Sequence, residues 1–367
     1  MFLGTFAWSF VYVSLPFHIE RLSTLDPAAT LRWTGWILGI SSLVTVVTAP
    51  LWGRHAERGN PKRLYVRAQF LQGIAFFGTA VARTLPELFA SRLALGFVGA
   101  VSTFAFVSVG RSGDAGDIRR QVAAVQSAMT IGHVIGPLAG ALAAARIGFR
   151  ASFVLGGLIL WATSALVAWG VPDPEPRPAA PPERPAGVTS VAAAALIVLG
   201  ASTQVFFLTS VLPRILPGLG VPETETLEIS GVILFASGVA AALGALATPR
   251  LREAVREPRL IALLLVASSG LVAALGMSAS AWSFGVLRFL QALCVAPVFP
   301  LVVAGIVEHA GGAAIGFVNS SRIGAAFLGP VLATTLLAWT SPETLYLALA
   351  ALGLACVPFV PRSRAVP

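Results

Sequence analysis

Charge is scarce in this sequence, and its long apolar stretches lack one sign of it entirely. Only 11% of the 367 residues are charged, lysine occurs once, and none of the 16 acidic residues lies within those stretches. Three arginines do lie within them, namely Arg92, Arg288 and Arg322. An arginine near the centre of a bilayer costs about 2.5 to 3.5 kcal/mol on insertion scales, so arginines retained there indicate a pathway that they line.

Cysteines and catalytic signatures are also sparse. The two cysteines, Cys294 and Cys356, both fall in apolar stretches, and we interpret them as small packing residues rather than a disulfide or metal framework. The sequence has no Walker-type Gly-Lys-Ser/Thr, no paired acids within an apolar stretch and no cluster with metal-ligand spacing. We therefore expect no enzyme activity, no cofactor, no bound metal and no ATP coupling within this chain.

Apolar runs are what the sequence has in abundance, with 56% hydrophobic residues and a mean hydropathy of +0.83. A helix needs about 20 mainly apolar residues to cross a bilayer, and only helices satisfy their own backbone over such a length. We predict an all-α membrane protein, and we divide the long run from Leu260 to Val307 at Ser278-Ala279-Ser280. The twelve predicted spans are 2–19, 33–53, 64–82, 88–110, 121–145, 151–171, 188–212, 229–249, 260–278, 282–306, 313–338 and 343–360.

The net charge of +9 follows a topological pattern and does not indicate a nucleic-acid partner. With both termini in the cytoplasm, 16 of the 25 Lys and Arg lie in or beside cytoplasmic loops, six lie outside and three lie within spans. Cytoplasmic loops of membrane proteins carry such an excess of positive charge. We predict a multi-pass protein surrounded by the lipid bilayer. The excess of arginine over a single lysine, Lys62, is typical of GC-rich bacterial genomes and favours a bacterial inner (plasma) membrane. The first span has no basic stretch before it, so we interpret it as an anchor and not as a signal peptide.

Proline divides the spans into two sets of six. The segment from Pro172 to Pro185 holds seven prolines in 14 residues, a density that favours extended chain and excludes helix. We predict an N-terminal six-helix bundle over residues 1–171, a proline-rich cytoplasmic linker over 172–187, and a C-terminal six-helix bundle over 188–367.

The two halves also repeat each other. Gln126-Ser127 in the fifth span matches Asn319-Ser320 in the eleventh, and Gly136-Pro137 matches Gly329-Pro330. Repeated six-helix units with a site near the bilayer midplane between them are a transporter architecture.

The segment that follows the second span, Gly53 to Arg63, resembles the signature loop of the major facilitator superfamily. The resemblance lies in a glycine turn, an acid a few residues later and then basic residues. It implies that Glu57 pairs with arginines such as Arg58 and with the inner end of the eleventh helix, and so locks one conformation. The chain departs from the family pattern at His55, Glu57, Asn60 and Pro61.

The fifth span resembles the antiporter motif of drug:proton exporters in the same superfamily. Its pattern is Gly132, three residues, Gly136-Pro137, two residues and Gly140, with Ala141 in place of a last glycine. Proline bends a helix and small residues let a neighbouring helix approach closely, so this segment is expected to act as a seal or hinge. The whole chain is similar to bacterial twelve-span multidrug exporters of the drug:proton antiporter-1 group.

The three intramembrane arginines have different interpretations. Arg92 occupies the position of the family's fourth-helix arginine, which implies a part in proton transfer; the alternative is an arginine bonded to backbone carbonyls of a broken helix. Arg322, one turn after Asn319, is the best candidate for contact with an anionic group of a substrate, because a guanidinium fork suits carboxylate or phosphate. For Arg288, six residues after Trp282, we expect a side chain that snorkels toward the interface.

Proton coupling has few candidate residues, because relays in transporters usually run through Asp, Glu or His. His133 is the only titratable group deep in a predicted span, and its alternative role is a histidine hydrogen-bonded within a tight helix pair. His18 and Glu20, at the outer end of the first span, could form a proton entry site.

Aromatic and amide side chains complete the candidate site. Trp8, Tyr12, Gln204 and Phe207 are plausible liners of an apolar cavity, with lipid contact or helix packing as the alternative for each.

These observations predict a monomeric secondary transporter with two pseudo-symmetric six-helix bundles that works by alternating access. Its expected partners are a small-molecule substrate and the proton gradient. The resemblance of the fifth span to the antiporter motif implies that its activity is proton-coupled efflux of small amphipathic molecules or drugs. The first alternative is a facilitator or symporter for an organic anion. The second is a membrane sensor or scaffold that transports nothing.

Overall fold

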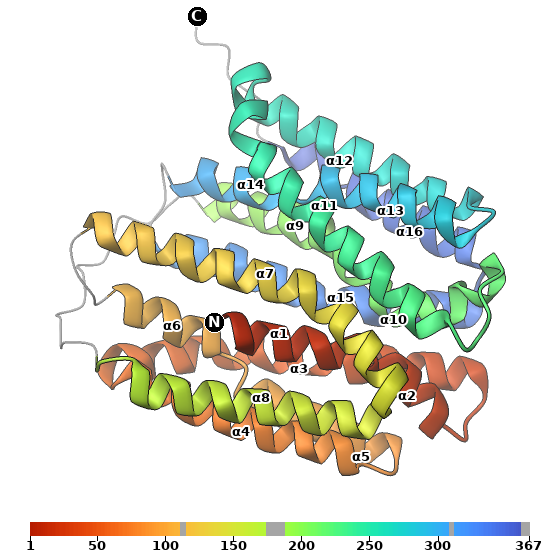
Figure 1. Ribbon diagram of the computed structural model, residues 1–367. Coiled ribbons are helices and arrows are strands. Elements are labelled where there is room, and N and C mark those ends of the chain that lie inside the picture. The colour runs from red at the N-terminus through yellow and green to blue at the C-terminus, as the bar shows by residue number, and fades with distance from the viewer. Residues whose placement is uncertain (111–114, 174–187, 308–311, 361–367) are drawn as a thin grey trace, which may run out of the picture. The chain divides into compact units, whose positions relative to one another are not determined.

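Helices form every regular element of the part of the chain that the structure describes (Figure 1). This structure is a computed structural model, and it describes residues 1–110, 115–173, 188–307 and 312–360. The helices are α1 (Phe2–Tyr12), α2 (Leu15–Leu22), α3 (Pro27–Arg58), α4 (Pro61–Val81), α5 (Leu85–Phe97), α6 (Val101–Gly110), α7 (Ala115–Ile147), α8 (Phe149–Gly170), α9 (Val188–Phe206), α10 (Leu208–Ile215), α11 (Thr226–Ala254), α12 (Glu257–Ala274), α13 (Ala281–Val295), α14 (Val298–Val307), α15 (Gly312–Trp339) and α16 (Pro342–Leu354), with short 3₁₀ turns at Pro217–Leu219, Leu275–Met277 and Val357–Phe359.

The predicted all-α membrane fold is confirmed. Within the described residues, 11 helical segments are long and apolar enough to cross a membrane. The remaining predicted span corresponds to α4, which has 21 residues and is not among these segments; Arg67, Gln69 and Gln72 make it less apolar than the others. The predicted division between the ninth and tenth spans is also confirmed, since α12 ends at Ala274 and the Ser280 side chain caps the first turn of α13.

Several spans are broken into two helices, which the sequence did not lead us to expect. The first span divides into α1 and α2, with Pro16 in the first turn of α2, and the seventh divides into α9 and α10 at Phe207. The fourth and tenth spans divide similarly, into α5 and α6 and into α13 and α14. A break frees backbone carbonyls of the preceding helix, and those groups need new partners in an apolar environment.

The signature segment after the second span is mostly helical, which corrects the expectation of a loop. Helix α3 continues through Gly53 and Glu57 to Arg58, so only Gly59 and Asn60 separate it from α4. The Asn60 side chain accepts a hydrogen bond from the Arg63 amide at 3.1 Å and caps α4. A side-chain acceptor at this position satisfies an amide that the first turn leaves unpaired.

An ion pair joins the start of α4 to the chain beyond α8. Lys62 Nζ lies 3.3 Å from Asp173 Oδ1. Hydrogen bonding from Lys62, and then from Asn60, holds the pKa of the Asp173 carboxyl below its usual value. Because both groups meet solvent, this attraction contributes little to stability. Beyond Asp173, the predicted linker lies outside the described residues.

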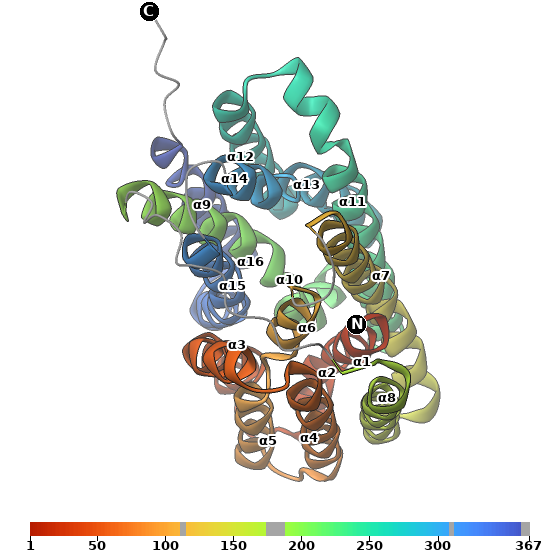
Figure 2. The same cartoon turned by 90° about the vertical axis from the view of Figure 1, so that its left-hand side faces the viewer.

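The chain forms two compact units. The first comprises Met1–Asp26, Trp36–Ala180 and Leu227–Phe235, and the second comprises Pro27–Gly35, Pro181–Thr226 and Ala236–Pro367. The predicted bundle boundaries at residues 171 and 188 stay a prediction. Within the first unit α1 packs against α7 and α4 against α8, and within the second α9 packs against α15 and α12 against α16 (Figures 1 and 2).

The glycines of the fifth-span motif form the seam between α7 and α1. A Cβ atom on Gly136 would lie 3.0 Å from the Phe6 carbonyl oxygen, and one on Gly140 would overlap the backbone of Phe10. Backbone therefore meets backbone, as small residues spaced by four allow. In the second unit Gly329 approaches α9 in the same way, with a Cβ position 3.0 Å from the Phe207 amide nitrogen.

The seam makes a prediction for stability. Gly140→Leu should force α7 away from α1 and lower the thermal unfolding temperature of the detergent-purified protein, because overpacking costs about 1 to 3 kcal/mol. Gly270→Leu is the matched control, since Gly270 lies exposed within α12 and a Cβ there meets nothing within 4 Å. An unchanged melting temperature for Gly140→Leu would contradict the close approach.

Candidate functional site

Two of the three intramembrane arginines are buried inside the protein. Arg92 in α5 is 1% exposed and Arg288 in α13 is 2% exposed. They belong to corresponding spans of the two halves, and each lies against the first span of its own unit. The energetic cost of a charge in the membrane is therefore met by protein groups rather than by lipid.

Arg288 binds the end of the broken seventh span. Its Nη1 donates to the carbonyl oxygen of Gln204 at 2.8 Å and to Oε1 of Gln291 at 2.5 Å, and its Nη2 donates to the carbonyl oxygen of Val205 at 3.0 Å. Both carbonyls belong to the last turn of α9, where the break leaves them without intrahelical partners. The snorkelling interpretation of Arg288 is therefore wrong, because these buried acceptors hold its guanidinium inside the unit.

Gln204 and Phe207 belong to the same buried cluster. Gln204 Nε2 donates to Ser269 Oγ and to the Leu349 carbonyl oxygen, both at 3.0 Å, and its Oε1 accepts from Ser268 Oγ at 3.2 Å. Phe207 is fully buried. We expected both side chains to line a substrate cavity, but in this conformation neither is accessible and their contacts are those of packing.

Arg92 has a different environment. Its guanidinium carbon lies 5.3 Å from the ring centroid of Trp8 and 5.9 Å from that of Tyr12, both on α1. Its Nε and Nη2 have no hydrogen-bond partner among the described residues. The alternative considered for Arg92, an arginine bonded to carbonyls of a broken helix, therefore describes Arg288 instead. Arg92 lies against aromatic faces, which attract cations.

Polar side chains of the third and ninth spans complete each arrangement. Trp8 Nε1 donates to Oε1 of Gln72 at 3.1 Å, and Gln72 Nε2 donates to the Val98 carbonyl oxygen at 2.8 Å. The Gln204–Ser268 bond occupies the corresponding place in the second unit. We missed Gln72 and Ser268 in the sequence, although a signal was present.

That signal is a constant separation along the chain. Trp8 and Gln204, Gln72 and Ser268, and Arg92 and Arg288 are three pairs with the same separation in sequence. Each unit thus repeats one arrangement, in which an arginine of the fourth span of that half lies against its first span.

His133 lies on the seam, at the middle of the span Arg120–Ile147. Its Nδ1 is 2.8 Å from Ser9 Oγ on α1, and its side chain is exposed on the surface of the first unit. From the sequence alone we did not identify Ser9 as the hydrogen-bond partner of His133. The histidine therefore has a hydrogen bond across a tight helix pair and also access to its surroundings, so both interpretations made from the sequence remain open.

Arg322 and Asn319 share one face of α15, as residues three apart on a helix do. Both side chains are exposed. The Arg322 guanidinium carbon lies 4.8 Å from the ring centroid of Phe299 on α14, so the cation lies over an aromatic face. A cation held in this way can still offer its N–H groups to an anion.

The remaining motif residues lie at helix ends or bends. Glu57 and Arg58 are exposed in the last turn of α3, one turn after Gly53. The implied pairing of Glu57 with the eleventh span stays a prediction. Pro137 and Pro330 both lie inside long helices, α7 and α15, directly after the glycines of the seams.

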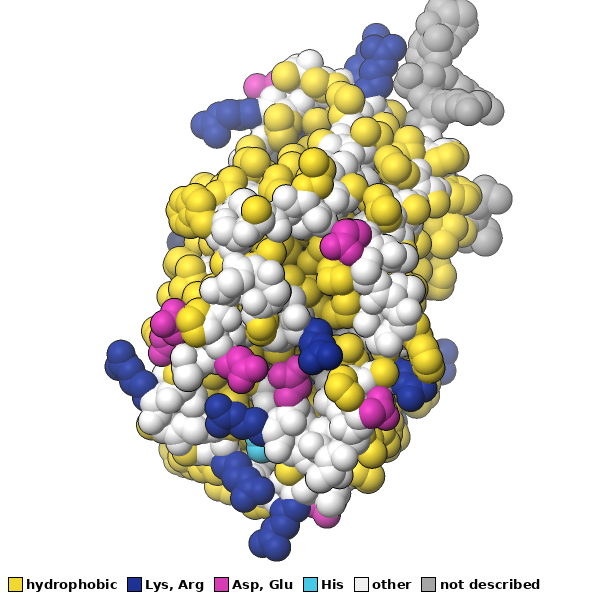
Figure 3. Space-filling model, turned by 90° about the vertical axis from the view of Figure 1, so that its right-hand side faces the viewer, with side chains coloured by type: hydrophobic (Ala, Val, Ile, Leu, Met, Phe, Trp, Pro, Cys, Tyr) yellow, Lys and Arg dark blue, Asp and Glu magenta, His cyan; other side chains and the backbone are white. Residues whose placement is uncertain are grey.

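Acidic residues of the described spans lie near span ends, as with Glu20, Glu87, Glu228 and Glu343. Figure 3 shows Asp, Glu, Lys and Arg side chains that lie singly among hydrophobic and other atoms on one face. The described residues contain no cluster of three or more His, Cys, Asp or Glu that could hold a metal. Within the described spans these carboxylates thus lie near span ends, whereas His133 lies near the middle of its span.

Known proteins resemble the chain in sequence. A family model described as Major Facilitator Superfamily matches residues 1–265. The MFS-type transporter YuxJ of Bacillus subtilis is 23% identical over 333 residues, covering 87% of this chain and 83% of that protein. The multidrug resistance protein MdtG of Citrobacter koseri is 24% identical over 321 residues, covering 84% of this chain and 78% of that protein.

Solved structures share the fold. The nucleoside transporter NupG superposes with a TM-score of 0.75 at 16% identity, covering 98% of this chain and 96% of its own. The human organic anion transporter MFSD10 superposes with a TM-score of 0.69 at 16% identity, with the same two coverages. Family and fold agree with each other and with the helix pattern, and neither is that of an enzyme. The chain belongs to the Major Facilitator Superfamily and is a multi-pass membrane transporter, for which its bacterial relatives imply the inner membrane.

Proposed function

We propose that this transporter exports small amphipathic molecules in exchange for protons by alternating access. The observation that carries the proposal is the position of His133, a titratable group at the middle of a span and hydrogen-bonded across the seam between α7 and α1. The multidrug resistance proteins among the relatives support an exported substrate of this class.

Protonation of His133 changes the charge of the seam without removing its hydrogen bond. In the neutral imidazole with its proton on Nε2, Nδ1 accepts from the Ser9 hydroxyl; in the imidazolium, Nδ1–H donates to the Ser9 oxygen. The bond survives with its direction reversed, while a positive charge arises between α7 and α1. A charged imidazole favours the conformation that hydrates it, so proton binding shifts the population between access states.

The close contact between α7 and α1 supports a coupling role for His133, because a change at His133 can alter the position of both helices. Gly132, Gly136 and Gly140 bring α7 into backbone contact with α1, and Pro137 interrupts the α7 ladder within the same turns. A helix with a missing backbone donor bends more easily than a continuous one. A charge change at His133 therefore acts on a bend and on the helix that carries Trp8 and Tyr12.

The charge pattern suits substrates with an anionic or neutral head. Arg322 and Asn319 present donors on the exposed face of α15, and acids of the described spans lie near span ends. The same observation favours the second candidate function, a facilitator or symporter for an organic anion. The transporter relatives disfavour the sensor or scaffold alternative.

The excess of basic residues in alternate loops supports cytoplasmic N- and C-termini. A monomer is the expected functional state, since each half repeats the arginine arrangement within one chain. The two six-helix bundles joined by the proline-rich linker are the bodies that would rock in alternating access.

His133→Asn should abolish gradient-driven transport while leaving the fold intact. Asparagine can keep a hydrogen bond to Ser9 but cannot take up a proton, so drug accumulation in proteoliposomes should no longer respond to an imposed pH gradient. We expect a loss of at least about tenfold in gradient-driven flux, with downhill flux of the same drug retained. His55→Asn, at the exposed end of α3, is the control and should behave as wild type.

A His133→Asn protein that still accumulates drug under a pH gradient would exclude His133 as the coupling group. Wild-type flux that does not respond to collapse of the gradient would exclude proton exchange and leave the facilitator.

Arg322→Gln should discriminate between substrates by charge. A charged hydrogen bond is worth about 1.5 to 3 kcal/mol, so the KM for anionic amphiphiles should rise by about tenfold or more, while that for neutral ones changes less than about twofold. Arg259→Gln, an exposed arginine at the start of α12, is the control. Equal effects of Arg322→Gln on anionic and neutral compounds in the flux assay would remove Arg322 from the substrate site.

A further inference from the structure

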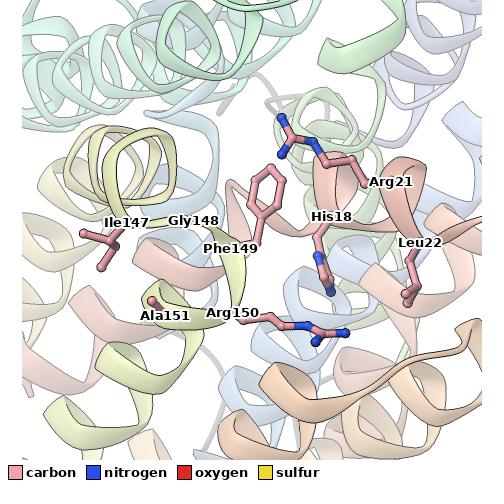
Figure 4. Close-up of a pocket in the computed structure, with 8 residues that line it drawn as sticks. All are labelled: His18, Arg21, Leu22, Ile147, Gly148, Phe149, Arg150 and Ala151. Carbon is pink, nitrogen blue, oxygen red and sulfur yellow. The ribbon is translucent and has the colours of Figure 1, made fainter.

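A cationic pocket lies at one end of the first unit, between α2 and the start of α8. It encloses about 520 Å³, and Figure 4 shows the residues that line it. Among them are His18 and Arg21 of α2 and Gly148, Phe149 and Arg150 around the start of α8. None of the described residues that line it is acidic. Its volume suits a small ligand or a lipid headgroup.

Two side chains, Arg21 and Arg150, give the pocket its charge. Arg21 and Arg150 are both exposed, and Figure 4 shows them on either side of His18. The Arg21 guanidinium carbon lies 4.8 Å from the ring centroid of Phe149, which holds it in place. Arg150 Nη2 donates weakly to the Ala82 carbonyl oxygen at 3.4 Å, and this contact uses one of its five N–H groups.

His18 supplies an independent observation. Its side chain is only 6% exposed, and its Nε2 has no hydrogen-bond partner among the described residues. Phe149 and Phe153 pack against the ring, with centroids 5.6 and 5.2 Å away, so the ring is fixed where it lines the pocket. A buried polar atom without a partner is costly, and a ligand oxygen would satisfy it.

The third component is the N-terminus of α8. Gly148 is the N-cap residue, with φ of 82°, and it provides no side-chain hydrogen bond to the first turn. The 22-residue helix therefore directs the positive end of its dipole, and amides without a side-chain cap, toward the pocket. Such a helix end, together with arginines, is a common environment for phosphate.

We propose that this pocket binds a phosphate group, carried either by a membrane lipid headgroup or by a soluble phosphate. Phosphate offers enough acceptor oxygens for both arginines, for His18 Nε2 and for the amides of α8 at once, which a carboxylate does not. The pocket lies where the span Phe2–Leu22 ends and the span Phe149–Gly170 begins, the depth at which headgroups lie.

The second unit provides a natural comparison. Arg214 lies in the last turn of α10 as Arg21 lies in the last turn of α2, and Glu343 follows the first residue of α16 as Arg150 follows the first residue of α8. The N-cap residue of α16, Ser341, accepts a hydrogen bond from the Thr344 amide at 3.4 Å, so that helix start has a side-chain cap. The repeat thus keeps one arginine and loses the other features of the site.

Thermal unfolding and native mass spectrometry of the full detergent-purified chain test the proposal. The probes are phosphatidylglycerol, diacylglycerol with the same acyl chains but no phosphate, and inorganic phosphate. We expect phosphatidylglycerol or inorganic phosphate to bind the wild type and raise its melting temperature, with diacylglycerol without effect. The double variant Arg21→Gln, Arg150→Gln should lose at least about tenfold in affinity at an unchanged basal melting temperature.

The pattern of ligands separates the two sources. Binding of phosphatidylglycerol alone identifies a lipid site, and binding of inorganic phosphate identifies a soluble one. Arg214→Gln, which changes the counterpart arginine, should bind as wild type does. The proposal is overturned if neither phosphate ligand binds, if diacylglycerol binds equally well, or if the double variant and Arg214→Gln lose affinity equally. His18→Phe, which keeps the ring packing without the Nε2 donor, should weaken binding without unfolding the chain.

Discussion

The binding of a broken helix end by a buried guanidinium is the interaction on which the second unit depends. A helix that breaks inside a membrane protein leaves carbonyl oxygens that water cannot reach, and the fold must supply donors for them. Arg288 does so for α9, with hydrogen bonds of 2.8 and 3.0 Å to two carbonyls of its last turn. Arg288, a costly charge within an apolar stretch, thus stabilises the helix break that divides the seventh span.

The first unit repeats this arrangement but leaves it incomplete. Arg92 rests on Trp8 and Tyr12, and two of its guanidinium nitrogens have no partner in the described structure. On the same helix α1, Ser9 bonds to His133 across the glycine seam. The repeat therefore separates two roles: the Arg288 guanidinium of the second unit donates to two backbone carbonyls and to Gln291, whereas Arg92 of the first unit leaves two guanidinium nitrogens without a partner in the described structure.

Local features were predictable from the sequence, but the contacts that side chains make with distant helices were not. Hydropathy defined the spans and the division before Ser280, and glycine spacing indicated the seam at Gly136 and Gly140, because each depends on residues near one another in the chain. The burial of Arg288 depends on a helix break at Phe207 that hydropathy does not register. Gln204 looked like a cavity liner for the same reason, since its partners lie on other helices.

The most direct test compares Arg92→Gln with Arg288→Gln, measuring thermal unfolding and gradient-driven flux for both proteins. Arg288→Gln should lower the melting temperature, because buried acceptors left unpaired cost about 1 to 3 kcal/mol. Arg92→Gln should leave the melting temperature unchanged or higher and abolish gradient-driven flux. Equal destabilisation by the two substitutions, or full transport by Arg92→Gln, would contradict the division of roles between the two arginines.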